Sequence, residues 1–497
     1  MRCEVVIVGA GSAGCVLAAR LSQDPSCSVT LLEAGPDYPD QAGLPPEIAS
    51  GLSPAFSHDW GYRSEPGALG RRLELYRGRL VGGCSATNAG FALRGAPGDY
   101  DEWAALGNPG WSFAEVLPFF RALERDLDGD DQWHGRDGPL PIRRPGIEEL
   151  DPLARAFLDA CAVAGYQLIA DHNAPGAMGA GPAPVNVVGG IRQSTALTYL
   201  AQARTRPNFT VRSGALVDRV VIEGGRAVGV RLAEPAKTLP AGRVILAAGS
   251  FGSPAILLRS GIGPAAALGA LGIPVVADRP AVGANLLDHP GVGVVFTTDV
   301  PARAGMPWFQ AMLTAARTPT GASPDLHVVL GHRLAEAADD PAIAWLWVAL
   351  LKPRARGRLR LRSADPATAP IVELGLLDHP DDLAGLLAGV RIARRLARTD
   401  PLGGLLGAER YPGAAVADDG PQLEAAVRAD ASTYFHPVGT CRMGRDDDPF
   451  AVVDAQGRVH GVDGLWVVDA SIMPTIPAAN TNIPTIMMAE RCAAWLG

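Results

Sequence analysis

The chain has 497 residues, of which 47% are hydrophobic, 19% are charged and 59 are glycine, and its formal net charge is −8. This composition excludes a disordered or fibrous protein and is typical of a compact α/β enzyme with core enough for two or three domains. Because only two lysines occur and the arginines are scattered, we expect no nucleic-acid partner.

The cysteines and the hydropathy pattern indicate where the protein works. Seven cysteines occur without any C-x-x-C pair, which favours reduced thiols and a cytoplasmic location over a disulfide framework or a zinc site. Residues 1–4 lead straight into the first predicted strand, so we expect no signal peptide. The longest apolar run, residues 342–351, is too short to cross a bilayer, and we expect no membrane insertion.

The first predicted elements are a buried strand over residues 5–8 and a helix that begins within a G-x-G-x-x-G motif. In such a motif Gly9 permits the tight turn and Gly11 lets a pyrophosphate approach the backbone. Gly14 lets the helix pack closely on the strand. The pyrophosphate then lies at the helix N-terminus, where free N–H groups favour an anion.

A second predicted strand, residues 29–32, completes this unit and ends in Glu33, about 20 residues after Gly14. An acid at this position can accept hydrogen bonds from an adenosine ribose. The unit therefore predicts a dinucleotide site, and by itself it leaves FAD and NAD as alternatives.

The next part of the chain alternates between loops and helices. Residues 35–75 are rich in proline and glycine and predict a long surface excursion over the cofactor. Residues 78–90 carry glycines that let backbone approach a flat or phosphorylated ligand. We expect helices that begin near residue 99 and cover residues 113–124, 152–164 and 194–203, with irregular chain at residues 129–141 and 176–190.

The later elements include a hairpin about the glycine pair at residues 224–225, with strands at residues 216–222 and 227–232. A strand at residues 244–247, a glycine turn and a helix at residues 255–260 indicate that the chain returns to the nucleotide-binding domain. The remaining expectations are strands at residues 325–330, 344–350, 357–361 and 464–468, a glycine-rich linker at residues 401–421, and a closing helix at residues 483–496.

Several blocks of the sequence resemble the glucose–methanol–choline (GMC) flavoprotein oxidoreductases, in that family's order and over nearly the whole chain. They are the N-terminal motif and residues 78–88, 249–263, 436–444 and 467–482. Within the family, residues 470–482 look most like bacterial 5-hydroxymethylfurfural and aryl-alcohol oxidases, whereas residues 184–188 resemble mycofactocin-associated GMC dehydrogenases. Both branches stay open.

The resemblance implies an α/β fold class, with a Rossmann-like FAD-binding domain. It also implies an α+β substrate domain built on an antiparallel sheet flanked by helices. We expect the FAD-binding domain to comprise residues 1–150, 205–291 and 432–497, and the substrate domain residues 151–204 and 292–431.

The resemblance also implies the residues that bind FAD. They are Gly9, Gly11, Ser12, Ala13, Gly14, Glu33, Ala34, Arg79, Gly83, Asn88, Ala89, Val217, Asp469, Ala470, Asn480 and Thr481. Some members of the family bond FAD covalently to a histidine, but the matching position here is Thr87. We therefore expect non-covalent FAD.

The catalytic pair of the family maps to His436 and Asn480. A histidine suits transfer of the hydroxyl proton at neutral pH, and a second hydrogen-bonding group can orient the alkoxide. We assign His436 as the acid/base and Asn480 as the partner that holds the substrate oxygen. His289 is interpreted as structural support.

The resemblance predicts FAD-dependent oxidation of a small primary alcohol, for which the aromatic residues Phe91, Trp345, Trp347 and Tyr434 favour an aryl or furanic substrate. Tyr434 takes the place of a small residue often found in oxygen-using members, so oxygen and another acceptor, such as a mycofactocin-type carrier, are both open. The other alternative is a non-redox lyase or decarboxylase, which the retained catalytic pair disfavours.

Three further histidines, His134, His327 and His332, are predicted to lack metal-ligating neighbours, and no metal is expected.

Overall fold

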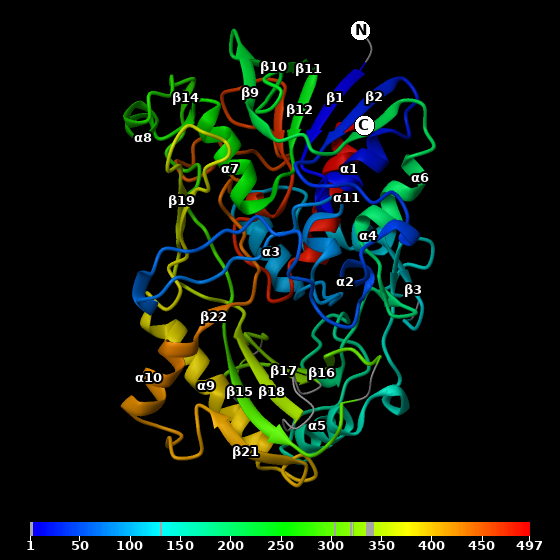
Figure 1. Cartoon of the computed structure of the whole chain (residues 1–497), viewed down its shortest axis with the longest axis vertical. Helices are drawn as coiled ribbons and strands as arrows, with labels where there is room; N and C mark the ends of the chain where they lie inside the picture. Colours follow the sequence, from blue (N-terminus) through cyan, green and yellow to red (C-terminus); the bar gives the residue numbers. More distant parts are fainter. Residues whose placement is uncertain (1–2, 130–131, 303–304, 319–320, 322, 334–341) are drawn as a thin grey trace.

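The computed structural model describes residues 3–129, 132–302, 305–318, 321, 323–333 and 342–497. Two sheets lie at opposite ends of the molecule (Figure 1). One has five parallel strands in the order β23-β12-β1-β2-β8, and the other has seven strands paired antiparallel. The predicted fold class, a Rossmann-like sheet combined with an antiparallel sheet, is confirmed.

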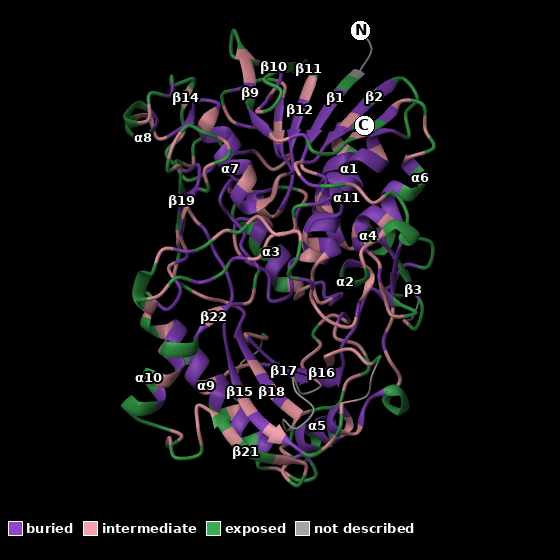
Figure 2. Ribbon diagram, in the orientation of Figure 1, coloured by how far each residue is buried: buried purple, intermediate pink, exposed green. Residues whose placement is uncertain are grey.

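The parallel sheet is buried on both faces at its central strands, as expected for strands covered by helices, and is partly exposed at its edge strand Phe209–Arg212. Its strands are β1 (Cys3–Val8), β2 (Cys27–Leu32), β8 (Phe209–Arg212), β12 (Arg243–Leu246) and β23 (Leu465–Val467). The first helix, α1 (Ser12–Leu21), packs on the closing helix, α11 (Asn482–Leu496). Figure 2 shows both helices and the strands β1, β2 and β12 largely buried. The two ends of the chain therefore share one core.

The antiparallel sheet carries helices on one face. Its strands are β5 (Gly179–Pro182), β15 (Pro290–Thr298), β16 (Phe309–Ala315), β17 (Leu326–Arg333), β18 (Ala342–Leu350), β21 (Leu406–Tyr411) and β22 (Ser432–Thr433). The helices are α5 (Pro152–Val163), α9 (Pro380–Ala397) and α10 (Pro421–Asp430). Strand residues of alternate positions, such as Leu346 and Val348, pack with these helices in one apolar cluster.

The opposite face of this sheet carries Trp345 and Trp347, because side chains alternate along a strand. Each indole lies against a glycine of a neighbouring strand. A Cβ atom on Gly331 would meet the Trp345 ring at 2.1 Å, and one on Gly291 would meet the Trp347 ring at 2.7 Å. These glycines let both rings lie close to the sheet, which builds an aromatic surface facing the middle of the molecule.

The remaining helices and strands lie outside the two large sheets. The helices are α2 (Pro46–Ala49), α3 (Pro97–Ala105), α4 (Phe113–Leu123), a π-helical turn (Ala196–Leu200) with α6 (Ala201–Ala203), α7 (Gly249–Arg259) and α8 (Ala265–Ala270). The strands are β3 (Glu124–Asp126), β4 (Leu140–Ile142), β6 (Val187–Val188), β7 (Ile191–Arg192), β9 (Val217–Glu223), β10 (Arg226–Leu232), β11 (Thr238–Pro240), β13 (Ile262–Gly263), β14 (Ala277–Asp278), β19 (Arg358–Arg360) and β20 (Ile371–Glu373). The predicted helices near residues 99, 113, 152 and 194, the hairpin and the closing helix are confirmed.

The helix predicted at residues 255–260 begins earlier than expected, at Gly249. Pro254 suggested a later start, because a proline inside a helix leaves the carbonyl four residues before it without its usual N–H donor. That carbonyl belongs to Ser250, and it accepts a hydrogen bond of 2.7 Å from the Thr440 hydroxyl instead. A residue distant in sequence thus compensates for the proline.

Two segments predicted to be irregular contain strands of the antiparallel sheet. The linker prediction for residues 401–421 is wrong at β21, which pairs with β15, and residues 176–190 include β5, which pairs with β16. Both are edge strands with glycines in place of apolar residues, so they lack the period-2 pattern that predicts a strand. Conversely, the strand predicted at residues 357–361 forms as β19, but it pairs only with β20 and does not belong to the seven-stranded sheet.

The division of the chain into two domains stays a prediction. No helix among the described residues is both long and apolar enough to span a bilayer. The first two residues, on which the expected lack of a signal peptide partly rests, lie outside the described residues.

Candidate active site

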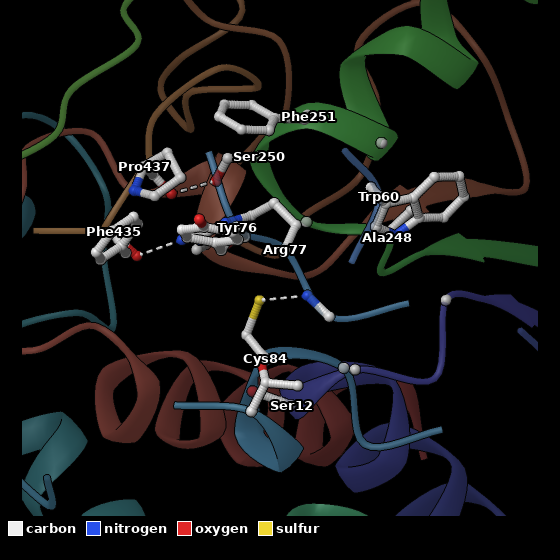
Figure 3. Close-up of a pocket in the computed structure, with 18 of the residues that line it drawn as sticks. Ser12, Trp60, Tyr76, Arg77, Cys84, Ala248, Ser250, Phe251, Phe435 and Pro437 are labelled. Atoms are coloured by element: carbon white, nitrogen blue, oxygen red, sulfur yellow. Dashed lines mark hydrogen bonds between the residues drawn. The ribbon is translucent and has the colours of Figure 1, made fainter. Parts of the chain in front are cut away.

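A cavity of about 530 Å³ lies between the two sheets, and the residues that line it come from segments far apart in the sequence. Figure 3 shows Ser12 and Cys84 on one side of this cavity, opposite Phe251 and Pro437. The Pro437 carbonyl accepts a hydrogen bond of 2.6 Å from the Ser250 hydroxyl, which ties the α7 end of the cavity to the segment that follows His436. The cavity has the size of a cofactor or substrate site.

Most of the residues predicted to bind FAD line this cavity. They are Gly9, Gly11, Ser12, Ala13, Glu33, Ala34, Gly83, Asn88, Ala89, Val217, Asp469, Ala470, Asn480 and Thr481. Gly14 and Arg79 are not among its lining residues. A Cβ atom on Gly14 would lie 1.9 Å from the Gly9 carbonyl oxygen, so Gly14 serves the packing of α1. The Arg79 guanidinium lies 4.9 Å from the centre of the Trp60 ring, which is itself part of the wall.

The glycines at the cofactor end leave room for a thin, extended ligand. A Cβ atom on Gly83 would lie 2.6 Å from the Gly11 Cα, so the two glycine-rich loops touch backbone to backbone. A Cβ atom on Gly11 would meet only the Gly83 Cα, at 3.9 Å, and would otherwise enter the cavity. This cradle fits the pyrophosphate of a dinucleotide such as FAD.

Glu33 is held in place by the backbone around it. Its carboxylate accepts hydrogen bonds from the backbone N–H groups of Ala10 at 3.0 Å and Gly35 at 2.9 Å. Burial raises the pKa of Glu33, while these N–H groups oppose that rise. Because each carboxylate oxygen has a further lone pair, Glu33 can still accept from a ribose hydroxyl.

Asp469 joins two parts of the cofactor end. It accepts hydrogen bonds from the Gly249 N–H at 2.9 Å, the Ser253 hydroxyl at 2.6 Å and the Ser471 N–H at 2.8 Å. Burial raises its pKa. Asp469 thus positions the start of α7 against the chain after β23.

His436 and Asn480 meet at the other end of the cavity, where the Asn480 Nδ2 lies 3.2 Å from the His436 Nε2. Phe435, directly before the histidine, has φ of +65°, a strained conformation for a bulky residue. Burial, with His289, Arg77 and His327 nearby, lowers the pKa of His436 well below its usual value. The imidazole is therefore neutral at pH 7 and can act as a base.

The wall formed by the antiparallel sheet is aromatic and uncharged. The described residues that line the cavity include four charged ones, Glu33, Arg77, Arg259 and Asp469, and none of these belongs to that sheet. The aromatic and apolar residues of this end are Phe91, Trp308, Phe309, Val329, Trp345, Trp347 and Tyr434. The sequence identified four of these aromatics as candidates and missed Trp308, Phe309 and Val329. The strand predicted at residues 325–330 included Val329, but no local pattern indicated that its side chain faces the cavity.

A buried charged cluster lies outside this cavity, and the prediction that His134 lacks metal-ligating neighbours is wrong. Its Nδ1 lies 3.0 Å from Asp126 and 3.3 Å from Glu124, and its Nε2 lies 2.9 Å from Asp171. Arg94 pairs with Glu124, and Arg144 pairs with Asp126 and Asp171. The three carboxylates are balanced by two arginines and a protonated His134, so the cluster needs no metal ion.

Replacing His134 with alanine is expected to lower the free energy of unfolding by about 3 kcal/mol near pH 6, since it leaves buried carboxylates short of a partner. Burial disfavours the charged imidazole, but hydrogen bonds to Asp126, Asp171 and Glu124 outweigh it and raise the pKa of His134 to about 10. The stabilisation is therefore complete below the unfolded-state pKa of about 6.5 and is lost as the pH rises towards 10. Urea unfolding of both proteins from pH 6 to 10 tests this. The same difference in the free energy of unfolding between the two proteins at every pH would contradict this prediction.

Comparison with known proteins adds to this geometry. Two sequence profiles described as GMC oxidoreductase match residues 3–291 and 353–489. The chain is 42% identical to a 5-(hydroxymethyl)furfural oxidase of Methylovorus sp. (strain MP688) over 99% of this chain and 98% of that protein. It is 37% identical to an oxygen-dependent choline dehydrogenase of Rhizobium etli over 99% of this chain and 95% of that protein. The crystal structure of pyridoxine 4-oxidase from Mesorbium loti superposes with a TM-score of 0.92 at 33% identity, covering 99% of both chains.

Proposed function

Because this chain belongs to the GMC oxidoreductase family, flavin enzymes acting on CH–OH donors, we propose that it oxidises a neutral primary alcohol of the aryl or furanic class to the aldehyde. One observation supports the proposal above all. A single cavity joins a dinucleotide cradle to the His436–Asn480 pair and to an uncharged aromatic wall.

Each member of the pair has one task in this proposal. The neutral His436 offers a lone pair on Nε2, which takes the hydroxyl proton as the O–H bond breaks. With the alcohol bound, the Asn480 Nδ2 donates its hydrogen bond to the substrate oxygen instead of to the His436 Nε2, and so stabilises that oxygen as it becomes negative. FAD, when bound, supplies the acceptor for the hydride that leaves the carbon.

The aromatic wall supports a flat, neutral substrate. Trp345 and Trp347 can stack on an aryl or furan ring, and the relative at 42% identity is named for a furanic alcohol. A cationic alcohol such as choline would find no carboxylate among the described residues of the sheet side of the cavity. We therefore favour the neutral class over choline.

Oxygen is the proposed electron acceptor, since the relatives at 42% and 37% identity are named as an oxidase and an oxygen-dependent enzyme. A non-oxygen carrier, such as a mycofactocin-type one, is the alternative. The Tyr434 ring lines the cavity beside His436, with the two ring centres 4.5 Å apart, and leaves both acceptors open, because it can hinder oxygen or simply pack.

Anaerobic mixing of the holoenzyme with 5-(hydroxymethyl)furfural, benzyl alcohol and choline tests the substrate class. We expect the flavin absorbance to bleach with the two neutral alcohols and to persist with choline. Bleaching by choline alone would contradict the proposal. Admitting oxygen afterwards should restore the absorbance within the turnover time, whereas a flavin that stays reduced would assign the electrons to another acceptor.

FAD is proposed to be bound without a covalent bond, because the cavity residue at the position of the family's linking histidine is Thr87. Acid precipitation should leave the yellow colour in solution. We also propose a cytoplasmic location, because Cys15, Cys27, Cys84, Cys161, Cys441 and Cys492 are all free thiols.

A further inference from the structure

The side chain of His436 has a second neighbour that the catalytic pair does not include. The His289 Nδ1 lies 2.9 Å from the His436 Nδ1, within hydrogen-bond distance, and the two rings meet edge to face with their centres 5.2 Å apart. Both imidazoles are buried. One of the two facing nitrogens must therefore donate a proton and the other must accept it.

The partners of these rings decide which nitrogen donates. With the Asn480 carboxamide in the orientation of the structure, its Nδ2 can only donate, so the His436 Nε2 accepts and carries no proton. A neutral His436 then has its proton on Nδ1 and donates it to His289. On the opposite edge of the ring, the His289 Nε2 lies near the backbone of Leu351 and Pro477 but forms no hydrogen bond.

We propose that His289 is a positioning residue that holds His436 in the tautomer whose Nε2 carries no proton. This inference rests on the proposed function, in which that nitrogen takes the alcohol proton. The accepting Nδ1 of His289 orients the His436 ring and favours the cation that forms when Nε2 takes the proton. The alcohol O–H bond breaks, the Nε2–H bond forms, and the proton on Nδ1 stays where it was.

His289 is suited to accept a hydrogen bond. Burial, with Lys352 nearby, lowers the pKa of His289 to about 3, so this ring is neutral at pH 7 and one of its two nitrogens carries a lone pair. A carboxylate in this place would bring a full buried charge to the pair, whereas a neutral imidazole supplies only a hydrogen bond.

The backbone holds the two histidines in register. The His289 carbonyl accepts from the Tyr434 N–H at 2.8 Å, and Pro290 pairs with Thr433 across β15 and β22. Asp288 accepts from the His436 N–H at 2.9 Å. The contact between the rings is therefore built on an antiparallel ladder rather than on flexible side chains.

Two substitutions of His289 separate this role from simple packing. His289→Asn keeps an acceptor oxygen close to the place of Nδ1, whereas His289→Leu removes the acceptor. With His289→Leu we expect flavin reduction to slow about tenfold to a hundredfold with little change in substrate affinity, because the base loses its orientation. With His289→Asn the rate should recover to within about threefold of wild type. His327→Leu is the matched control, since His327 is buried near Tyr434 without bonding His436.

Nitrogen NMR of histidine-labelled holoenzyme tests the tautomer without any turnover. We expect the wild type and His289→Asn to show His436 protonated on Nδ1, and His289→Leu to show a mixture of both tautomers. A wild-type His436 protonated on Nε2, or equal reduction rates in His289→Leu and His327→Leu, would overturn the proposal. If no alcohol bleaches the flavin, the proposed function fails, while the tautomer result still decides the role of His289.

Discussion

Replacing His436 with alanine is expected to slow the reduction of bound FAD by an alcohol by about two to four orders of magnitude, the usual contribution of a general base. The variant loses the Nε2 that faces Asn480 and lines the cavity. Anaerobic stopped-flow mixing with benzyl alcohol measures the rate. Equal rates in the variant and the wild type would remove His436 from its proposed role.

Asn480→Ala and the flavin spectrum serve as controls for this variant. The His436→Ala protein should keep its FAD and its visible absorbance, because the dinucleotide cradle is built from other segments, around Gly11 and Gly83. Asn480→Ala should slow reduction less severely, since it removes a hydrogen bond to the oxygen and leaves the base in place. Loss of FAD in both variants would show that the pair acts through cofactor binding instead.

Replacing Gly14 with alanine is expected to lower the free energy of unfolding by at least about 4 kcal/mol, which is exceptional for a single methyl group. The added Cβ would lie 1.9 Å from the Gly9 carbonyl oxygen, so α1 and the turn after β1 must separate. Urea unfolding of the holoenzyme measures the change. A loss below 1 kcal/mol, of the order seen at tolerant sites, would show that the helix can shift without cost.

Gly11→Ala separates cofactor binding from folding. Its Cβ would meet only the Gly83 Cα at 3.9 Å, so the fold tolerates it while the methyl group enters the cofactor cradle. We expect FAD affinity to fall about tenfold to a hundredfold, from a steric cost of about 1–3 kcal/mol. Release of flavin fluorescence on dilution measures the affinity. Gly98→Ala in α3 is the neutral control, since nothing lies within 4 Å of its added Cβ.

Predictions from sequence succeeded where the signal is local. The strand, glycine turn and helix over residues 5–21 form as expected, because backbone preferences and apolar periodicity act within a few residues. The predictions failed for strands that form only because they pair with a neighbouring strand. The edge strands β5 and β21 carry little apolar pattern and form because β16 and β15 offer them hydrogen bonds.

The candidate site shows the same division. The motif around His436 predicted the base, and the resemblance predicted Asn480 as its partner; the structure brings the two within 3.2 Å. His289 was interpreted only as support, because no local pattern shows that its ring meets His436. Trp308 and Phe309 were missed because they occur in a segment without a sequence motif, and the fold brings them to the wall with Trp345.

The sequence by itself determined the local backbone, the glycine cradle and the chemical types of the site residues, because these depend on φ/ψ freedom and side-chain chemistry over short spans. Only the tertiary structure decided which side chains share the cavity and which nitrogen of His436 faces it. Such contacts join residues far apart in the chain, and they follow from strand register and sheet packing, to which each residue contributes only a small part of the free energy.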